Sequence, residues 1–223
     1  MQTLYFFSGF DSQTGFPPEI VQSLHEHITD TKSLVLICSH PDTHEKMDKY
    51  SRGTVEWFKK IGIEFEATHF LDNRKTAAEC QELTKNASAI FLMGGPPHTQ
   101  LEFLQKYNLI SIIQQFNGVV MGMSAGALTM AANVFYRADK DFGMSHIYKG
   151  LGLADIPSEP HFSIDEKELL NNEILPFSHI IDIYAMCDGS GILVRGGKKQ
   201  FFGEIYLVSK GTVTKCKPTD CLK

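Results

Sequence analysis

The residues best suited to chemistry centre on one serine in the segment Gly122-Met123-Ser124-Ala125-Gly126. An apolar run typical of a strand precedes this segment, and helix-compatible residues 127–132 follow it. A strand that enters a helix through one tight turn projects its middle serine, and flanking glycines let the backbone crowd there. The next backbone N–H groups, beginning with Ala125, could face the oxyanion of an attacked carbonyl. The pattern predicts Ser124 as a nucleophile, with a structural Gly-Ser turn as the alternative.

A second glycine pair ends the preceding apolar run, in Met93-Gly94-Gly95-Pro96-Pro97-His98. Gly94 or Gly95 could bring a backbone N–H to the same carbonyl oxygen and complete a two-donor oxyanion hole. A plain strand-to-helix turn is the alternative. The segment has too few glycines for a dinucleotide fingerprint and lacks the Gly-Lys-Ser/Thr end of a P-loop, so no nucleotide cofactor is expected.

A serine nucleophile needs a base, normally a histidine that a carboxylate orients. The chain has nine histidines, and His161 is favoured because Pro157-Ser158-Glu159-Pro160-His161 is irregular and suits a functional loop. His146 and His179 also follow the serine, and His98 stands beside the glycine pair. His40 and His44 resemble a metal pair but have no third ligand near them in sequence, so no metal is expected.

Several aspartates could orient the histidine: Asp139, Asp141, Asp155, Asp165, Asp182 and Asp188. Asp188 follows an apolar stretch and precedes a glycine-rich turn, which predicts a position at a strand end. Asp139 has a different merit, since it lies a few turns beyond Ser124. The residues alone leave both Asp188 and Asp139 open.

The elements that must position these side chains alternate between strands and helices as far as residue 132. Apolar runs predict strands at residues 3–8, 33–38, 62–70, 88–93 and 118–122. Helical periodicity predicts helices at residues 17–28, 45–60, 75–85 and 99–116, the last broken at Asn108, and one from Ser124. This order predicts an α/β fold with a mostly parallel, doubly wound sheet whose ligands bind beyond the carboxyl ends of the strands.

The pattern changes after residue 133 to a stretch rich in Gly, Pro and Asp, then a short helix near residues 165–173. Strands with turns at Gly189 to Gly191 and at Gly196-Gly197 follow. Residues 200–208 and 212–216 predict an antiparallel hairpin at the edge of the sheet. No linker interrupts the chain, which predicts a single domain over residues 1–223.

Composition excludes several classes of protein. The 223 residues carry 21 basic and 26 acidic side chains, a net charge of −5, with no basic block to bind nucleic acid. No apolar run approaches the roughly 20 residues that span a bilayer, so no membrane partner is expected. Five scattered cysteines without a C-x-x-C spacing suit thiols of a reducing compartment, and no secretory signal is recognised. The sequence therefore predicts a cytoplasmic protein.

Five blocks of the chain occur in an order and spacing typical of one enzyme family: Phe91-Leu92-Met93-Gly94-Gly95, Gln100, Gly122-Met123-Ser124-Ala125-Gly126-Ala127, Gly150-Leu151-Gly152-Leu153 and Pro160-His161-Phe162. In these blocks the chain resembles the serine peptidases typified by dipeptidase E (α-aspartyl dipeptidase) and cyanophycinase. The resemblance implies a fold like that of class I glutamine amidotransferases. It also implies Ser124 as nucleophile, His161 as base, and either Asp139 or Asp188 as the acid.

The chain departs from the dipeptidase at two places. The dipeptidase block Gly-Gly-Gly-Asn-Thr is here Gly94-Gly95-Pro96-Pro97-His98, and residues 164–170 lack the arginine of the dipeptidase. Arginine is the side chain that best binds an aspartyl carboxylate. These departures count against aspartyl-dipeptide specificity.

The sequence as a whole predicts a serine peptidase that hydrolyses small peptides without metal or cofactor. Asp188 is mechanically preferred, since the acid must contact the far nitrogen of the histidine from a rigid neighbour. An esterase or amidase of α/β-hydrolase type is one alternative, although its order would be Ser, acid, His. A binding module that keeps the elbow only as architecture is another. A monomer and a homodimer are both compatible with the sequence.

Overall fold

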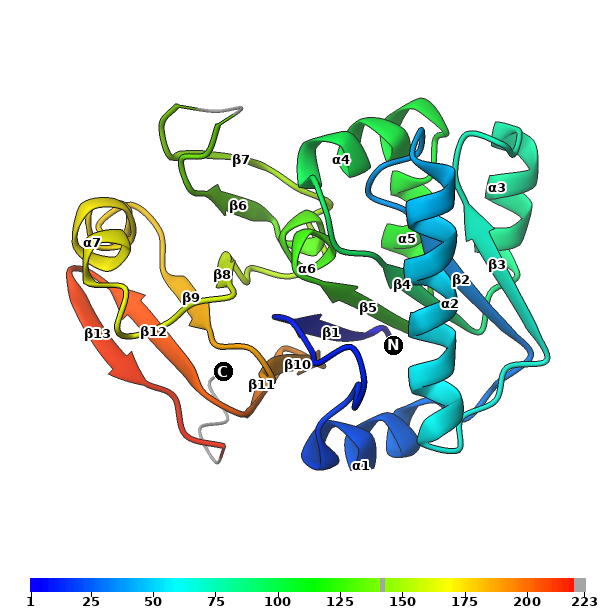
Figure 1. The fold of residues 1–223 in the computed structure, drawn as a ribbon, viewed down its shortest axis with the longest axis horizontal. Coiled ribbons are helices and arrows are strands. Elements are labelled where there is room, and N and C mark those ends of the chain that lie inside the picture. Colours follow the sequence, from blue (N-terminus) through cyan, green and yellow to red (C-terminus); the bar gives the residue numbers. More distant parts are fainter. Residues whose placement is uncertain (141–142, 219–223) are drawn as a thin grey trace.

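The computed structural model describes residues 1–140 and 143–218. The chain is an α/β protein whose largest feature is a seven-stranded sheet in the order β11-β10-β1-β5-β4-β2-β3 (Figure 1). Its parallel strands are β1 (Thr3–Phe7), β5 (Val119–Met123), β4 (Ala89–Leu92), β2 (Ser33–Ile37) and β3 (Ala67–Leu71). The hairpin of β10 (Gly191–Arg195) and β11 (Lys198–Phe202) extends the sheet antiparallel to β1. The predicted mostly parallel sheet is confirmed.

The central strands of this sheet are buried on both faces, which explains why they appear in the sequence as continuous apolar runs. On β1, Leu4 and Phe6 enter one hydrophobic cluster, whereas Tyr5 and Phe7 enter another on the opposite face. All four side chains are at most 4% exposed. The sheet therefore forms the rigid centre of the molecule.

Helices cover each face in the order that the sequence predicts. The cluster that contains Tyr5 and Phe7 includes residues of α1 (Pro18–His27) and α2 (His44–Lys60). The opposite cluster includes residues of α3 (Ala77–Lys85), α4 (Pro97–Lys106), α5 (Ile110–Gln115) and α6 (Ala125–Met130). The predicted break at Asn108 is confirmed, because Asn108 adopts a φ of 55° between α4 and α5.

One predicted strand is much shorter than expected. α2 ends at Lys60, residues 62–66 lie in the turn and loop after it, and β3 begins only at Ala67. Gly62 has a φ of 77° and donates to the carbonyl of Lys59, while the N–H of Ile63 donates to that of Phe58. These two bonds form a Schellman motif, so Gly62 terminates a helix here and does not open a strand.

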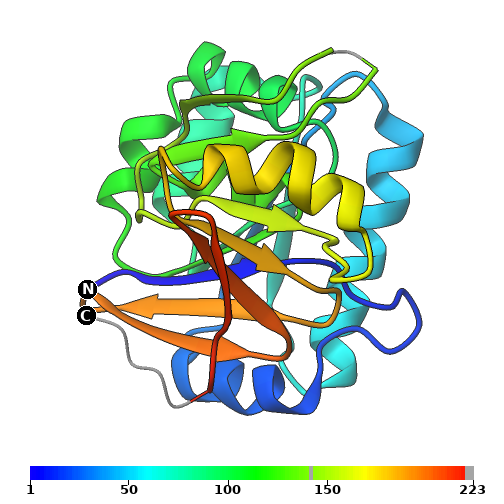
Figure 2. The same cartoon turned by 90° about the vertical axis from the view of Figure 1, so that its left-hand side faces the viewer.

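A smaller sheet stands beside the main one, in the order β13-β12-β9-β8. Its strands are β8 (Ser158–Pro160), β9 (Ile183–Met186), β12 (Ile205–Ser209) and β13 (Thr212–Lys215). A helical segment packs on it, formed by α7 (Lys167–Leu169), a π-helical turn (Leu170–Ile174) and α8 (Leu175–Phe177) (Figure 2). The helix predicted near residues 165–173 is thus present and extends to Phe177. A separate hairpin of β6 (Asn133–Tyr136) and β7 (His146–Lys149) was not predicted.

The C-terminal hairpin is confirmed, with β12 and β13 antiparallel at the edge of the smaller sheet. The run at residues 200–208 is, however, two strands that belong to different sheets. β11 ends at Phe202 in the main sheet, and β12 begins at Ile205 in the smaller one. Gly203, with a φ of 71°, makes the turn between them, because glycine adopts this conformation without steric cost.

The two sheets meet where the predicted chemistry lies. The end of β5 leads into Ser124, the end of β8 leads into His161, and Asp188 follows β9.

No helix among the described residues is long and apolar enough to cross a membrane. Cys38 and Cys80 are buried thiols, whereas Cys221 lies outside the described residues.

Candidate active site

Ser124 occupies a strained turn between β5 and α6. Its φ of 53° and ψ of −115° lie in a region that residues with a Cβ rarely adopt, and such strain persists only where neighbours fix the backbone. The N–H of Ser124 is shared between the carbonyls of Phe7 and Ser8, at 2.9 and 3.0 Å. Its own carbonyl accepts from the N–H of Leu128 at 3.1 Å. The main chain therefore holds this serine on both sides.

The two glycines of the Gly-x-Ser-x-Gly segment are required by close packing. A Cβ on Gly126 would lie 2.1 Å from the carbonyl oxygen of Leu92 in β4. A Cβ on Gly122 would lie 2.5 Å from the backbone of Gly126. Neither backbone neighbour can move away cheaply, so the elbow depends on both glycines.

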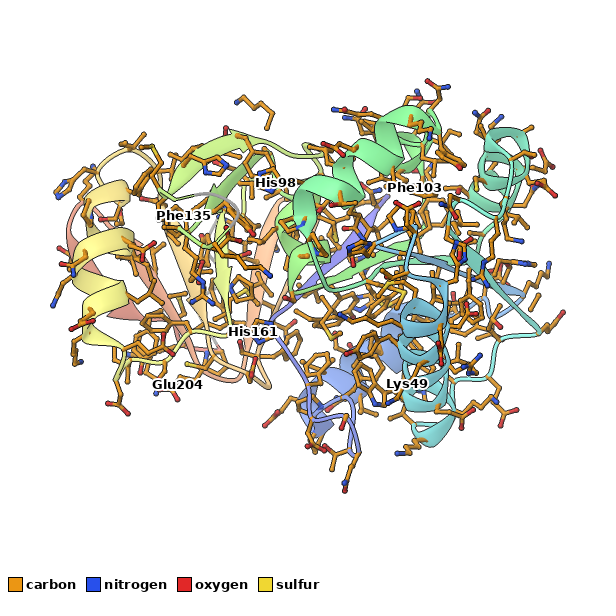
Figure 3. The ribbon with its side chains drawn as sticks, turned by 45° about the horizontal axis from the view of Figure 1, so that its top comes forward. Lys49, His98, Phe103, Phe135, His161 and Glu204 are labelled. Atoms are coloured by element: carbon orange, nitrogen blue, oxygen red, sulfur yellow. The ribbon has the colours of Figure 1, made fainter. Side chains whose placement is uncertain are left out.

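His161 connects Ser124 with Asp188 by side-chain hydrogen bonds. Its Nε2 lies 2.9 Å from Ser124 Oγ, and its Nδ1 lies 2.7 Å from Asp188 Oδ1. A carboxylate at Asp188 takes Nδ1–H as its donor, which leaves Nε2 free to accept the serine proton. The His161 side chain is 45% exposed and that of Asp188 is 65% exposed. Both side chains thus stand at the surface, and His161 lies between the two sheets (Figure 3).

The smaller sheet positions the histidine and the acid. His161 follows β8 directly and has a φ of 57°, another strained conformation for a residue with a side chain. The N–H of the next residue, Phe162, donates to the carbonyl of Met186 at the end of β9. Since β8 and β9 are parallel neighbours, their carboxyl ends deliver His161 and Asp188 to the same edge.

Asp139 takes a different place from Asp188. It lies on the wall of the pocket in front of Ser124, and its Oδ2 accepts from the hydroxyl of Tyr136 at 2.5 Å. Of the two acids that the sequence left open, the structure brings Asp188, and not Asp139, to the ring of His161. Asp141 lies outside the described residues.

The remaining histidine candidates lie apart from this arrangement. Nε2 of His98 faces Nε2 of His146 at 3.3 Å, and burial lowers the pKa of His98. His44 contacts the side-chain oxygen of Asn73. Within residues 1–140 and 143–218, no group of three or more His, Cys, Asp or Glu side chains could hold a metal ion.

The glycine pair Gly94 and Gly95 lies directly beside the nucleophile. A Cβ on Gly94 would be 3.5 Å from the Cβ of Ser124, in ordinary contact. The hydroxyl of the fully buried Ser39 donates to the carbonyl of Gly94. Gly95 has a φ of 135°, and a Cβ there would collide with Ser39 Oγ at 2.1 Å. Ser39 thus fixes the orientation of the peptide between the two glycines.

A pocket of about 210 Å³ opens in front of Ser124, with Gly95 and Ala125 in its lining. Two ionisable residues on its wall lie in contact, with Arg137 Nη1 3.3 Å from Glu159 Oε1. The Arg137 side chain is 42% exposed, whereas that of Glu159 is only 4% exposed. Burial raises the pKa of Glu159 to about 8, against the opposing effect of Arg137.

Comparisons with known proteins identify the family of the chain. The sequence profile of peptidase family S51 matches residues 8–202. The chain belongs to peptidase family S51. It is a serine-type peptidase by this membership, and the predicted family resemblance is confirmed. A search of curated proteins found no match to the chain.

Two solved structures share the fold of this S51 peptidase. A peptidase from an acI-B1 Actinobacterium has a TM-score of 0.73 and 18% identity, over 99% of this chain and 96% of that chain. A protein described as a candidate peptidase E from Listeria monocytogenes EGD-e has a TM-score of 0.68 and 18% identity, over 91% of this chain and 98% of the other. At these identities the likeness concerns the fold.

Sequence reasoning missed four residues at the site of this S51 peptidase: Ser8, Ser39, Arg137 and Glu159. Ser39 follows a predicted strand and Ser8 is the last residue of another, but a lone serine at either place gives no specific signal. Arg137 lies on the hairpin of β6 and β7 that was not predicted. Glu159 stands two residues before His161, and its burial could not be inferred from the sequence.

Proposed function

We propose that this S51 peptidase hydrolyses small peptides through a triad of Ser124, His161 and Asp188. The observation that carries the proposal is the continuous chain of hydrogen bonds from Ser124 Oγ through the imidazole to Asp188. Serine becomes an effective nucleophile when a neighbouring base takes its proton, and the carboxylate then stabilises the imidazolium. All three groups face the edge where the two sheets meet.

The reaction proceeds in two halves. Ser124 Oγ attacks the carbonyl carbon of the peptide bond while His161 Nε2 takes the hydroxyl proton. The imidazolium gives that proton to the departing amine, which leaves an acyl group on Ser124. Water then attacks the ester with His161 as base, and the acid product leaves as the serine regains its proton.

We assign the oxyanion hole to the N–H groups of Ala125 and Gly95, with that of Gly94 as the alternative to Gly95. Ser39 draws the Gly94 carbonyl toward itself. Because the C=O and N–H of a trans peptide point in opposite directions, the Gly95 N–H points away from Ser39. Gly95 and Ala125 line the same pocket as the nucleophile, which supports a shared role. Removal of one such donor typically lowers the rate about 10²- to 10³-fold.

The pocket supports a small substrate. Its volume of about 210 Å³ is below the roughly 300 to 1,000 Å³ typical of ligand pockets. The partly exposed guanidinium of Arg137 suits a carboxylate, and a short peptide carries its terminal carboxylate near the bond that is cut. Arg137 supplies an arginine that residues 164–170 lack, from a different element of the fold.

Turnover of short peptides tests the proposal. The purified protein is incubated with dipeptides and tripeptides, each with a free and an amidated C-terminus, and product amines are quantified. We expect hydrolysis by the wild type, a preference for free carboxylates, and no hydrolysis by Ser124→Ala. A parallel assay with p-nitrophenyl acetate separates the rival activity, since ester cleavage without any peptide turnover would identify an esterase. Equal peptide turnover by Ser124→Ala would refute the proposed nucleophile.

A further inference from the structure

Ser8 stands just after the first strand and lies beneath the candidate triad. It follows β1 directly and opens the loop at residues 9–15, one of those in which chemistry was expected. Its side chain is fully buried, although the loop beyond it is partly exposed. Its N–H donates to the carbonyl of Ser190 at 3.1 Å, which fixes its backbone against the start of β10.

This one residue contacts every member of the triad. Its carbonyl accepts from the N–H of Ser124 at 3.0 Å. Its hydroxyl oxygen accepts from the N–H of His161 at 2.8 Å. The hydroxyl proton is directed between the carbonyl of Met186, at 3.0 Å, and Asp188 Oδ1, at 3.1 Å. Asp188 Oδ1, which accepts the hydrogen bond from the ring of His161, therefore also lies within hydrogen-bond distance of the Ser8 hydroxyl.

We propose that Ser8 is a positioning residue that sets the geometry of Ser124, His161 and Asp188 relative to one another. This role rests on the proposed function of the triad. The nucleophile belongs to the main sheet, whereas the histidine and the acid follow strands of the smaller sheet. Ser8 directly follows β1 of the main sheet and contacts both the nucleophile and the histidine–aspartate pair, so it couples the two halves of the site.

The need for such a coupling follows from exposure and strain. Asp188 is 65% exposed and His161 is 45% exposed, so packing alone does not confine their side chains. His161 also holds a φ of 57°, which costs free energy unless its surroundings fix it. The hydrogen bond from its N–H to Ser8 Oγ supplies one fixed point, and the Ser8 hydroxyl near Asp188 supplies another.

The next residue shows how closely this loop approaches the pair. A Cβ on Gly9 would lie 2.6 Å from Asp188 Oδ1 and 2.6 Å from Cε1 of His161. The Gly9 carbonyl also accepts from the N–H of Gly189 at 2.7 Å. The backbone just after β1 thus packs directly against the side chains of His161 and Asp188.

Ser190 provides a matched control for loss of a buried hydroxyl. It is fully buried like Ser8 and lies next to it, bonded through the backbone. Its Oγ has no hydrogen-bond partner among the residues that the structure describes. Removal of this hydroxyl changes local packing about as much as removal of the Ser8 hydroxyl, but breaks no contact with the triad.

The test compares Ser8→Ala and Ser8→Cys with Ser190→Ala and Ser190→Cys. Cysteine keeps a side chain of similar shape but is a weak donor and acceptor, so it covers the case in which Ser8→Ala fails to fold. For each variant, kcat and KM for a hydrolysed peptide, the rate of Ser124 labelling by a fluorophosphonate and the Tm are measured. We expect both Ser8 variants to lower kcat and the labelling rate about 10- to 100-fold with KM within about twofold, since misplaced catalytic groups lose rate. The Ser190 variants should stay within about twofold of the wild type in kcat.

Each contrary result points to a different error. Ser8 variants that match the Ser190 variants in kcat, beside an active wild type, would overturn the role of Ser8 and leave the triad intact. A raised KM with unchanged kcat would also overturn it, because Ser8 would then act on substrate binding. A folded wild type that neither turns over peptides nor labels at Ser124 would instead refute the proposed function, and the role of Ser8 with it.

Discussion

The nucleophile and its two partners are held by different means. Ser124 follows β5 of the main sheet, and backbone hydrogen bonds and the packing of Gly126 against β4 fix its turn. His161 and Asp188 follow strands of the smaller sheet, and their side chains are about half exposed. The comparison teaches that main-chain geometry places the serine, whereas individual side-chain hydrogen bonds place the base and the acid.

The two regions also differ in charge around the pocket. The main-sheet side contributes uncharged groups, namely Gly95, Ala125 and Leu128. The other side contributes three ionisable side chains, Arg137, Asp139 and Glu159, of which Glu159 is buried beside the partly exposed Arg137. We infer that the wall with the ionisable side chains, and not the glycine-lined side, selects the substrate.

The largest effect is expected from the acid that orients the base. Asp188→Asn should lower kcat about 10³- to 10⁴-fold, because an amide no longer favours the Nδ1–H tautomer of His161. Asp139→Asn removes the same charge from the pocket wall and should lower kcat less than about tenfold. Steady-state kinetics on one peptide substrate checks both variants. A larger loss of kcat in Asp139→Asn than in Asp188→Asn would show that Asp188 is not the acid that orients His161.

A smaller effect, on stability, tests how the main sheet holds the serine. Gly126→Ala places a Cβ 2.1 Å from the Leu92 carbonyl and should lower the free energy of unfolding by at least about 3 kcal/mol. Gly53→Ala is the control, since a Cβ at this exposed position of α2 meets nothing within 4 Å. It should raise the free energy of unfolding by up to about 1 kcal/mol. Urea unfolding of the two variants would contradict the account if both changes had the same sign.

The smallest effect concerns the buried carboxyl on the pocket wall. The pKa of Glu159 is about 8 in the folded protein, above its ordinary value of 4.5, so the folded state retains a proton that the unfolded chain releases. The contribution of this group to the free energy of unfolding is fully present below about pH 4.5 and is lost as the pH rises toward 8. Glu159→Gln does not titrate, so its free energy of unfolding should fall less between pH 5 and 8. Urea unfolding at several pH values checks this, and parallel curves for wild type and variant would contradict it.

Much of the main sheet could be predicted from the sequence. Its strands are buried on both faces, so apolar composition alone marks them, and helical periodicity marks the segments between. The strands outside the main sheet gave weaker signals in the sequence. β6 and β7 have four residues each, and the residues of β7, His-Ile-Tyr-Lys, show no clear alternation. The break at Gly203 was missed because an isolated glycine also fits a bulge within one continuous strand.

The candidate site divides in the same way. Ser124 could be recognised because the elbow is a local pattern of five residues. From sequence, Asp188 could be preferred to Asp139 only by a mechanical argument, because the choice depends on which strand ends beside His161. Ser8 lies 153 positions from His161, so only the fold reveals their hydrogen bond. Side chains that position others through such distant contacts leave no local pattern.

Covalent labelling with a fluorophosphonate tests the central claim most directly, since it requires both an exposed serine and a working base. Wild type, Ser124→Ala and His161→Ala are labelled side by side, and the modified peptide is located by mass spectrometry. The account predicts one modification at Ser124 in the wild type, none in Ser124→Ala and a rate lowered at least 100-fold in His161→Ala. A folded wild type that remains unlabelled, or labelling of Ser124→Ala at the wild-type rate, would contradict it.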